Sequence, residues 1–151
     1  MAKTAFDKLD VWNHAVELAV LVHEATEDCE HHYLSDRMLQ AAVNIAALIA
    51  EGAERASLKH FLHHVHRARG AAAELRTHLH LAERVGALQA ELARALHGET
   101  VAVTEKLHHL AKSLGHSEEQ HFVLAPVPYE DTDAPPRRGR PPGPTNKRRN
   151  R

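Results

Sequence analysis

The stretch 61–82, FLHHVHRARGAAAELRTHLHLA, decides the fold of this chain. Its apolar residues recur at alternating spacings of four and three positions: Phe61, Val65, Ala68, Ala72, Leu75, Leu79 and Ala82. Residues spaced in this way lie on one face of an α-helix, which completes a turn in about 3.6 residues. Ser57 is typical of a helix N-cap, and Gly86 tolerates the left-handed backbone of a helix C-terminus. The stretch therefore predicts a long amphipathic helix between Ser57 and Gly86.

Two further helices are predicted before this stretch. The first runs from about Asp7 to Cys29, and its apolar face consists of Val11, Ala15, Leu18, Val22 and Ala25. The second begins at a cap formed by Ser35 and Asp36. Its apolar face consists of Met38, Ala42, Ile45, Ile49 and Gly52. The small residues on this face permit close approach of a neighbouring helix.

A fourth helix is predicted after Gly86, ending at Gly115. Its apolar face consists of Leu88, Leu92, Leu96, Val103, Leu107, Leu110 and Leu114. Gly98 and Glu99 interrupt this face, so we expect a kink or a change of register near Gly98. Four amphipathic helices with short connections predict an all-α fold, an up-and-down four-helix bundle.

The chain has 151 residues, which is enough for one domain with one modest core. We assign residues 1–115 to the four-helix bundle. Residues 116–134 then form a partly extended linker punctuated by Pro, and residues 135–151 form a disordered basic tail.

Charge is distributed unevenly between the bundle and the tail. The tail, PPRRGRPPGPTNKRRNR, holds seven Lys or Arg residues and no acidic residue. Subtracting these seven from the 19 basic residues of the chain leaves 12 against all 20 acidic residues. The net charge of −1 therefore combines a body of −8 with a tail of +7. This asymmetry favours a tail that binds a polyanion, and the alternative is a tail that only keeps the protein soluble.

A second basic feature lies on the helix of residues 58–85. Placed at 100° per residue, six side chains fall within slightly more than a quarter turn, away from the apolar face. We call this set the basic stripe: Lys59, His66, Arg69, Arg76, His80 and Arg84. We expect it to contact nucleic-acid phosphates, because few aromatic residues are available to stack on bases. The alternative is a solvated helix face partly neutralised by Glu74 and Glu83.

Motifs of enzymes are missing from the sequence, which has no glycine-rich phosphate loop and no nucleophile elbow. Glu51 and Glu99 are isolated carboxylates, and we interpret Glu51 as a surface or interface residue. Cys29 is the only cysteine, so one chain can form neither a disulfide nor a cysteine-based zinc site. We expect a protein that is not an enzyme and uses no cofactor.

Fifteen histidines leave two further readings open. His60 and His64, four residues apart, and His23 with Glu27 have the spacing of a two-ligand metal chelate on a helix. Each pair supplies only two ligands, so we predict no functional metal site. Protonation of the histidines would also erase the negative charge of the body, giving a surface that responds to pH.

The sequence contains neither a signal-peptide core nor an apolar run long enough to cross a bilayer. The longest nearly apolar run is AAVNIAALIA, residues 41–50, and it includes Asn44. We therefore expect a cytoplasmic protein that does not bind membranes.

Three segments carry a resemblance to a known family: a Leu9-x-x-Trp12 entry, residues 49–52 (IAEG) with Arg55 and Ser57, and residues 68–75 (ARGAAAEL). Across residues 6–114 the chain resembles a bacterial four-helix bundle family. This family includes proteins encoded within intervening sequences of 23S rRNA genes and the accessory variability proteins of diversity-generating retroelements.

The resemblance implies a ring-shaped homopentamer. For the retroelement members it also implies binding of a reverse transcriptase and its template RNA. Relatives usually carry a basic segment before the Ala-Ala of the second helix, whereas this chain has only Arg37 there. The candidate nucleic-acid residues of the body are therefore Arg55, Lys59, Arg69, Arg76 and Arg84.

The tail has a resemblance of its own. Residues 137–143, RRGRPPG, look like an AT-hook, whose Arg-Gly-Arg-Pro centre corresponds to residues 138–141. Glycine lets the backbone lie deep in a narrow minor groove, and the flanking arginines run along its floor. The predicted tail contacts to RNA or DNA are Arg137, Arg138, Gly139, Arg140, Pro141, Lys147, Arg148, Arg149 and Arg151.

Together these features favour an oligomeric nucleic-acid-binding accessory protein that partners a reverse transcriptase and its RNA. The alternative is a structural scaffold of the rRNA intervening-sequence type, in which the bundle binds protein and the tail is a solubiliser. The choice between RNA and DNA stays open at this point.

Overall fold

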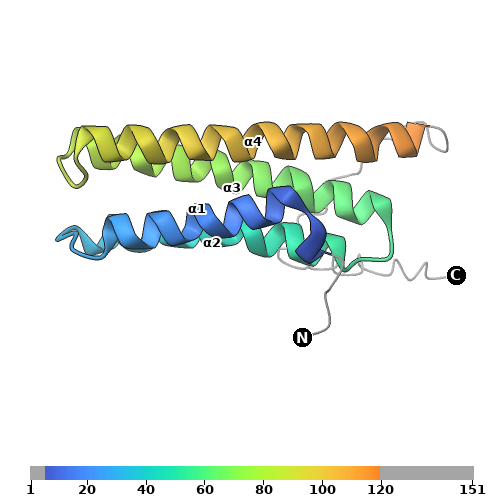
Figure 1. Cartoon of the computed structure of the whole chain (residues 1–151), viewed down its shortest axis with the longest axis horizontal. Helices are drawn as coiled ribbons and strands as arrows, with labels where there is room; N and C mark the ends of the chain where they lie inside the picture. Colours follow the sequence, from blue (N-terminus) through green and yellow to red (C-terminus); the bar gives the residue numbers. More distant parts are fainter. Residues whose placement is uncertain (1–5, 120–151) are drawn as a thin grey trace, which may run out of the picture.

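The computed structural model describes residues 6–119, which form four α-helices after one short 3-10 turn (Figure 1). The turn η1 spans Phe6–Lys8, followed by α1 (Asp10–Thr26), α2 (His32–Ala53), α3 (Leu58–Arg84) and α4 (Ala90–Glu119). Consecutive helices run antiparallel, and their connections alternate between the two ends of the molecule. The predicted all-α, up-and-down four-helix bundle is confirmed.

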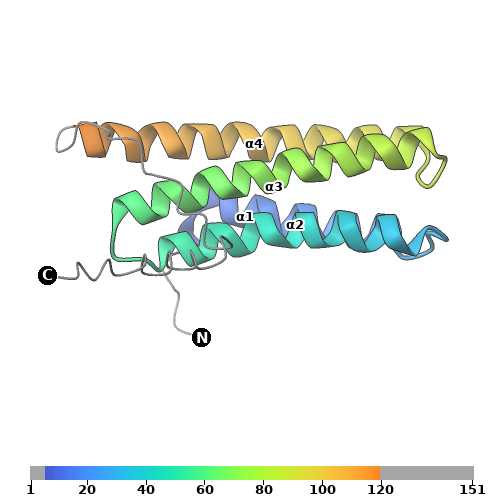
Figure 2. The same ribbon diagram turned by 180° about the vertical axis from the view of Figure 1, so that it is seen from behind.

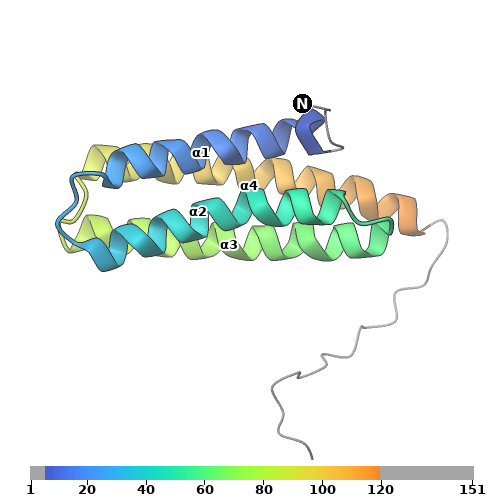
Figure 3. The same ribbon diagram turned by 90° about the horizontal axis from the view of Figure 1, so that it is seen from below.

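The helices pack as a ring of neighbours, with α2 and α4 each contacting both α1 and α3 (Figures 2 and 3). The core lies on the predicted apolar faces. On α3, Val65, Ala68, Ala72, Leu75, Leu79 and Ala82 are buried, and Phe61 is partly buried against them. The repeat that predicted this helix is therefore its core face.

Both ends of α3 lie where the sequence places them. Ser57 occupies the N-cap position with an extended backbone, although its hydroxyl makes no capping hydrogen bond. Gly86 has φ 74°, the left-handed conformation that favours glycine. The backbone N–H of Ala87 donates to the Ala82 carbonyl at 2.8 Å, which closes the helix.

The predicted start of α2 at Ser35 and Asp36 is wrong. The helix begins at His32, and Ser35 lies in its first turn, where its hydroxyl donates to the carbonyl of His31 at 3.3 Å. Leu34 lies in this added turn and is buried in the core, and this apolar contact favours the earlier start. The first helix is shorter than predicted, because Asp7 belongs to η1 and α1 ends at Thr26.

The change of register predicted in α4 near Gly98 is also wrong. The helix is continuous there and extends to Glu119, beyond the predicted end at Gly115. Thr100 is fully buried, and its hydroxyl donates to the Leu96 carbonyl at 2.7 Å. Because this local hydrogen bond satisfies the hydroxyl, Thr100 continues the apolar face in one register. Leu92 is instead 39% exposed.

None of the helices within residues 6–119 is both long enough and apolar enough to cross a membrane.

Candidate nucleic-acid interface

The basic stripe lies along the solvent-facing side of α3, on the flank next to α4. Arg69 is half-buried, and the other five members are exposed: Lys59, His66, Arg76, His80 and Arg84. The small residues Ala73 and Thr77 lie beside Arg76 and His80 in a hollow that also reaches His97 of α4. Five of the six members of the stripe are thus accessible from solvent.

The permanent cations of the stripe lack carboxylate partners. Within residues 6–119, Lys59, Arg69, Arg76 and Arg84 form no ion pair with Asp or Glu. The Nε atom of Arg69 is buried and also lacks a hydrogen-bond acceptor in this part of the chain. Glu74 and Glu83 form no ion pair with the stripe: Glu74 contacts His78 at 3.4 Å and Glu83 contacts Arg94 at 3.6 Å.

His66 contributes little positive charge to the stripe at neutral pH. Its pKa is lowered, first because partial burial disfavours the charged ring and then because Arg69 and His63 are nearby positive groups. The four Lys and Arg residues therefore carry most of the charge of the stripe at pH 7.

Two residues of α4 extend the basic surface, and sequence reasoning missed both. Arg76 Nε donates to His97 Nε2 at 3.4 Å, across the α3–α4 boundary. Arg94 lies one turn before His97 on α4 and pairs with Glu83 of α3. Positions 76 and 97 become neighbours only because α3 and α4 are antiparallel, so a periodicity within either helix does not reveal them.

Arg55, the remaining candidate of the body, lies in the connection between α2 and α3. Its guanidinium binds Glu51 Oε1 at 2.8 Å. His64 is buried, and its Nε2 lies 3.2 Å from the same Glu51 oxygen. Hydrogen bonds from Arg55 and then from His64 lower the pKa of Glu51. The charge of Arg55 is therefore partly neutralised, unlike that of the stripe.

The predicted tail contacts lie outside the described residues. These are Arg137, Arg138, Gly139, Arg140, Pro141, Lys147, Arg148, Arg149 and Arg151. The predicted linker and tail boundaries, 116–134 and 135–151, likewise fall almost entirely beyond residue 119.

The histidine pairs of the sequence do not converge on further metal ligands. In the part of the chain that the structure describes, no group of three or more His, Cys, Asp or Glu side chains is placed to hold a metal ion. His64 is engaged at both nitrogens, since Nδ1 donates to the His60 carbonyl at 2.8 Å and Nε2 faces Glu51.

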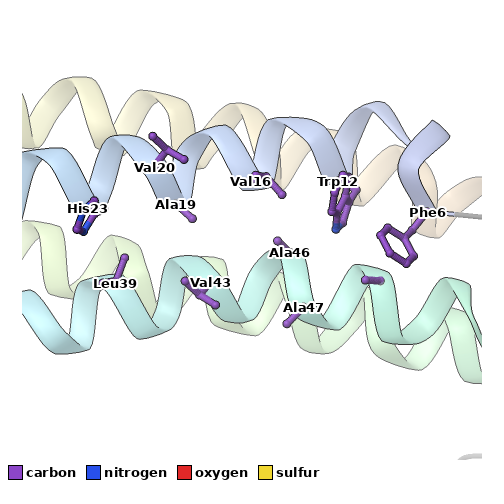
Figure 4. Close-up of a pocket in the computed structure, with 11 residues that line it drawn as sticks. Phe6, Trp12, Val16, Ala19, Val20, His23, Leu39, Val43, Ala46 and Ala47 are labelled. Carbon is purple, nitrogen blue, oxygen red and sulfur yellow. The ribbon is translucent and has the colours of Figure 1, made fainter. Parts of the chain in front are cut away.

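An apolar groove runs between α1 and α2, on a face formed by neither α3 nor α4 (Figure 4). Trp12 and Val16 of α1 face Ala46 of α2, and Phe6 packs on Trp12 with ring centroids 4.9 Å apart. Val20 and Val43 on the groove walls are 50% and 48% exposed. Apart from His23, every residue lining the groove is apolar.

The fold is shared with a solved structure, and the sequence matches a known family. A crystal structure at 1.70 Å of a protein of unknown function from the S23 ribosomal protein family of Bacteroides thetaiotaomicron VPI-5482 is similar, with a TM-score of 0.58 and 19% sequence identity. The alignment covers 68% of this chain and 98% of that one, and it shows a common fold. None of the curated proteins matches. The family model for the 23S rRNA-intervening sequence protein matches residues 7–109, and the chain belongs to this family.

Proposed function

We propose that this protein is a non-enzymatic accessory protein that binds the phosphate backbone of a nucleic acid through the basic stripe. One observation carries the proposal: the four Lys and Arg residues of the stripe are accessible and lack carboxylate partners within residues 6–119. Elsewhere on the bundle, Arg55, Arg94 and Lys106 each pair with a carboxylate. Lys8, Arg37, Arg67 and Lys112 also lack a carboxylate partner within residues 6–119, but they lie on four different elements and do not form a row. Unpaired cations aligned on one face are the electrostatic footprint of a polyanion site.

The tail, with its seven cations, is the second binding element of this proposal. A tail joined to the bundle raises the local concentration of cations at a nucleic acid already held by the stripe. Its Arg-Gly-Arg-Pro centre, residues 138–141, adds a preference for narrow minor grooves.

The partners proposed are an RNA and a reverse transcriptase, and the protein acts as their oligomeric adaptor in the cytoplasm. The reverse transcriptase rests on the resemblance to retroelement accessory proteins. Co-purification with a reverse transcriptase encoded beside this gene would support it, and a gene lying within a 23S rRNA intervening sequence would contradict it.

The groove between α1 and α2 supports self-association. Exposed apolar patches of this kind mark protein interfaces, and the helical faces on both walls are continuous with the bundle core. We take a second copy of the chain as the occupant of the groove, in a cyclic assembly. The number of subunits in this assembly, five, comes from the family resemblance. The same groove favours the alternative function, a protein-interaction scaffold whose tail is only a solubiliser.

The test of nucleic-acid binding compares two full-length variants that lose the same charge. In the first, Lys59, Arg69, Arg76 and Arg84 are all replaced by Gln. In the second, four body cations away from the stripe are replaced by Gln: Lys8, Arg37, Arg67 and Lys112. Affinity for duplex RNA is measured at fixed salt, with helicity checked by circular dichroism.

We expect the stripe variant to bind at least about tenfold more weakly than the control variant, because the stripe contacts phosphates directly. Equal affinities of the two variants would contradict binding by the stripe. If both variants bind duplex RNA as tightly as wild type, the result would support the alternative function, a protein-interaction scaffold.

A further inference from the structure

Two adjoining hollows lie on the boundary between α3 and α4, and His80 and His97 line both. The first also contains Ala73, Arg76 and Thr77, and the second contains Leu79, Glu83, Ala93 and Arg94. Side chains of two helices therefore converge on one place, which distinguishes it from the rest of the stripe.

The polar groups of the hollows include two permanent cations, Arg76 of α3 and Arg94 of α4, and two imidazoles, His80 of α3 and His97 of α4. Glu83 is the one carboxylate in the lining, and Arg94 already pairs with it at 3.6 Å. Thr77 contributes no free donor, because its hydroxyl donates to the Ala73 carbonyl at 2.9 Å. The arrangement suits a small anion with several acceptor oxygens.

His97 makes this site sensitive to pH. In the contact with Arg76, His97 Nε2 accepts a hydrogen bond, so that nitrogen carries no proton. When the ring is protonated, Nε2 becomes a donor and repels Arg76. An anion placed between the two side chains accepts from both and removes the repulsion. Protonation of the ring and binding of an anion between the two side chains therefore favour each other.

We propose that Arg76 and His97 together bind a phosphate group of the backbone of a duplex nucleic acid, with affinity that rises as His97 is protonated. The inference rests on the proposed function and adds to it a specific subsite. The charged groups that face His97 are Arg76, His80 and Glu83 from α3 and Arg94 from α4. Glu83, the one carboxylate among them, already pairs with Arg94, so a bound phosphate supplies the further negative charge that favours the protonated ring.

The test uses the full chain with Arg76→Gln and His97→Gln, and it measures duplex RNA affinity at constant ionic strength at pH 6 and pH 8. Arg67→Gln is the matched control for Arg76, since it is exposed, unpaired within residues 6–119 and on the opposite side of α3. His109→Gln is the control for His97, because it is exposed on α4 and lines neither hollow.

The wild-type chain is expected to bind more tightly at pH 6 than at pH 8. His97→Gln removes a share of this gain, about tenfold or more, because one charge-assisted hydrogen bond contributes on the order of 10- to 100-fold. Arg76→Gln weakens binding at both pH values, and the two controls behave as wild type. If wild type binds RNA and both site variants match it at both pH values, the subsite is wrong while the proposed function stands. If wild type fails to bind, the proposed function itself fails.

The source of the phosphate is tested by NMR of the His97 ring, assigned by comparison with His97→Gln. Titration with duplex RNA is expected to shift this signal at pH 6. A shift with inorganic phosphate but not with RNA would overturn the proposal, because the site would then hold a free anion.

Discussion

At the scale of single residues, Gly52 determines how closely α2 and α3 approach. A Cβ atom at this position would lie 2.7 Å from His64 Cβ and 2.9 Å from Phe61 Cδ2. The sequence placed Gly52 correctly on the apolar face of α2. It did not reveal that His64, which belongs to the predicted helix between Ser57 and Gly86, lies so close to position 52 that only a glycine fits there.

We expect Gly52→Ala to lower the free energy of unfolding by about 1–3 kcal/mol, because His64 Cβ cannot move without shifting α3. Gly70→Ala is the matched control, since nothing lies within 4 Å of its added Cβ. This control is expected to stabilise the protein by about 0.5–1 kcal/mol through helix propensity. Urea denaturation followed by circular dichroism measures both, and a neutral Gly52→Ala would contradict the close packing.

Glu51 gives a prediction of pH dependence. Arg55 and His64 lower its pKa from the ordinary value of 4.5. A carboxyl with a lowered folded-state pKa stabilises the fold above its unfolded-state value and loses this effect as the pH falls through the folded-state value. Glu51→Gln is therefore expected to destabilise the protein at pH 7 and to approach wild-type stability as the pH falls through the lowered folded-state pKa of Glu51. If the difference in unfolding free energy between wild type and Glu51→Gln stays constant from pH 7 to pH 3, the pairing of Glu51 with Arg55 and His64 would be contradicted.

At the scale of helices, burial follows the spacing of apolar residues. Leu75 of α3 is fully buried, whereas Leu81 of the same helix is 44% exposed. Leu75→Ala is expected to cost about 2–5 kcal/mol of unfolding free energy, because it leaves a cavity in the core. Leu81→Ala is expected to cost less than about 1 kcal/mol. Thermal and urea unfolding of the two variants test this ranking, and similar losses would contradict the packing of α3.

The sequence predicted the helices well where apolar residues alone form the buried face. It predicted them poorly where a polar residue occupies a core position. Thr100 is the example: its buried hydroxyl is satisfied by its own helix, so the apolar face of α4 continues where the sequence suggested a break. The basic stripe was predictable because it lies on one helix. Its extension by His97 and Arg94 was not, because it depends on the register between α3 and α4.

At the scale of the whole molecule, the groove between α1 and α2 predicts the assembly state. Val43→Glu places a charge on an exposed apolar wall of this groove, and we expect the protein to become monomeric while keeping its helicity. Asn44→Glu, an exposed neighbour on α2 that does not line the groove, is the control. Light scattering coupled to size exclusion measures the mass. A monomeric wild type, or a Val43→Glu variant with unchanged mass, would contradict this interface.

The charge pattern of the whole chain predicts two separable contributions to nucleic-acid binding. The body of −8 repels a polyanion overall, so binding depends on the stripe and the tail, where the cations are concentrated. Replacing only Arg138 and Arg140 by Ala separates two modes of tail binding. An AT-hook loses its preference for AT-rich duplex, whereas a plain polycation weakens on every sequence alike. Competition between AT-rich and GC-rich duplexes measures the difference.

The salt dependence of duplex binding by full-length proteins tests the central claim most directly. Four proteins are compared: wild type, a variant with the seven tail cations replaced by Gln, the stripe variant, and a variant carrying both sets of substitutions. The log–log slope is expected to be about −0.9 for each phosphate engaged on duplex DNA, steepest in wild type and shallower in each single-set variant. Binding is expected to be lost in the combined variant. A combined variant that binds as tightly as wild type, with the same slope, would contradict the account.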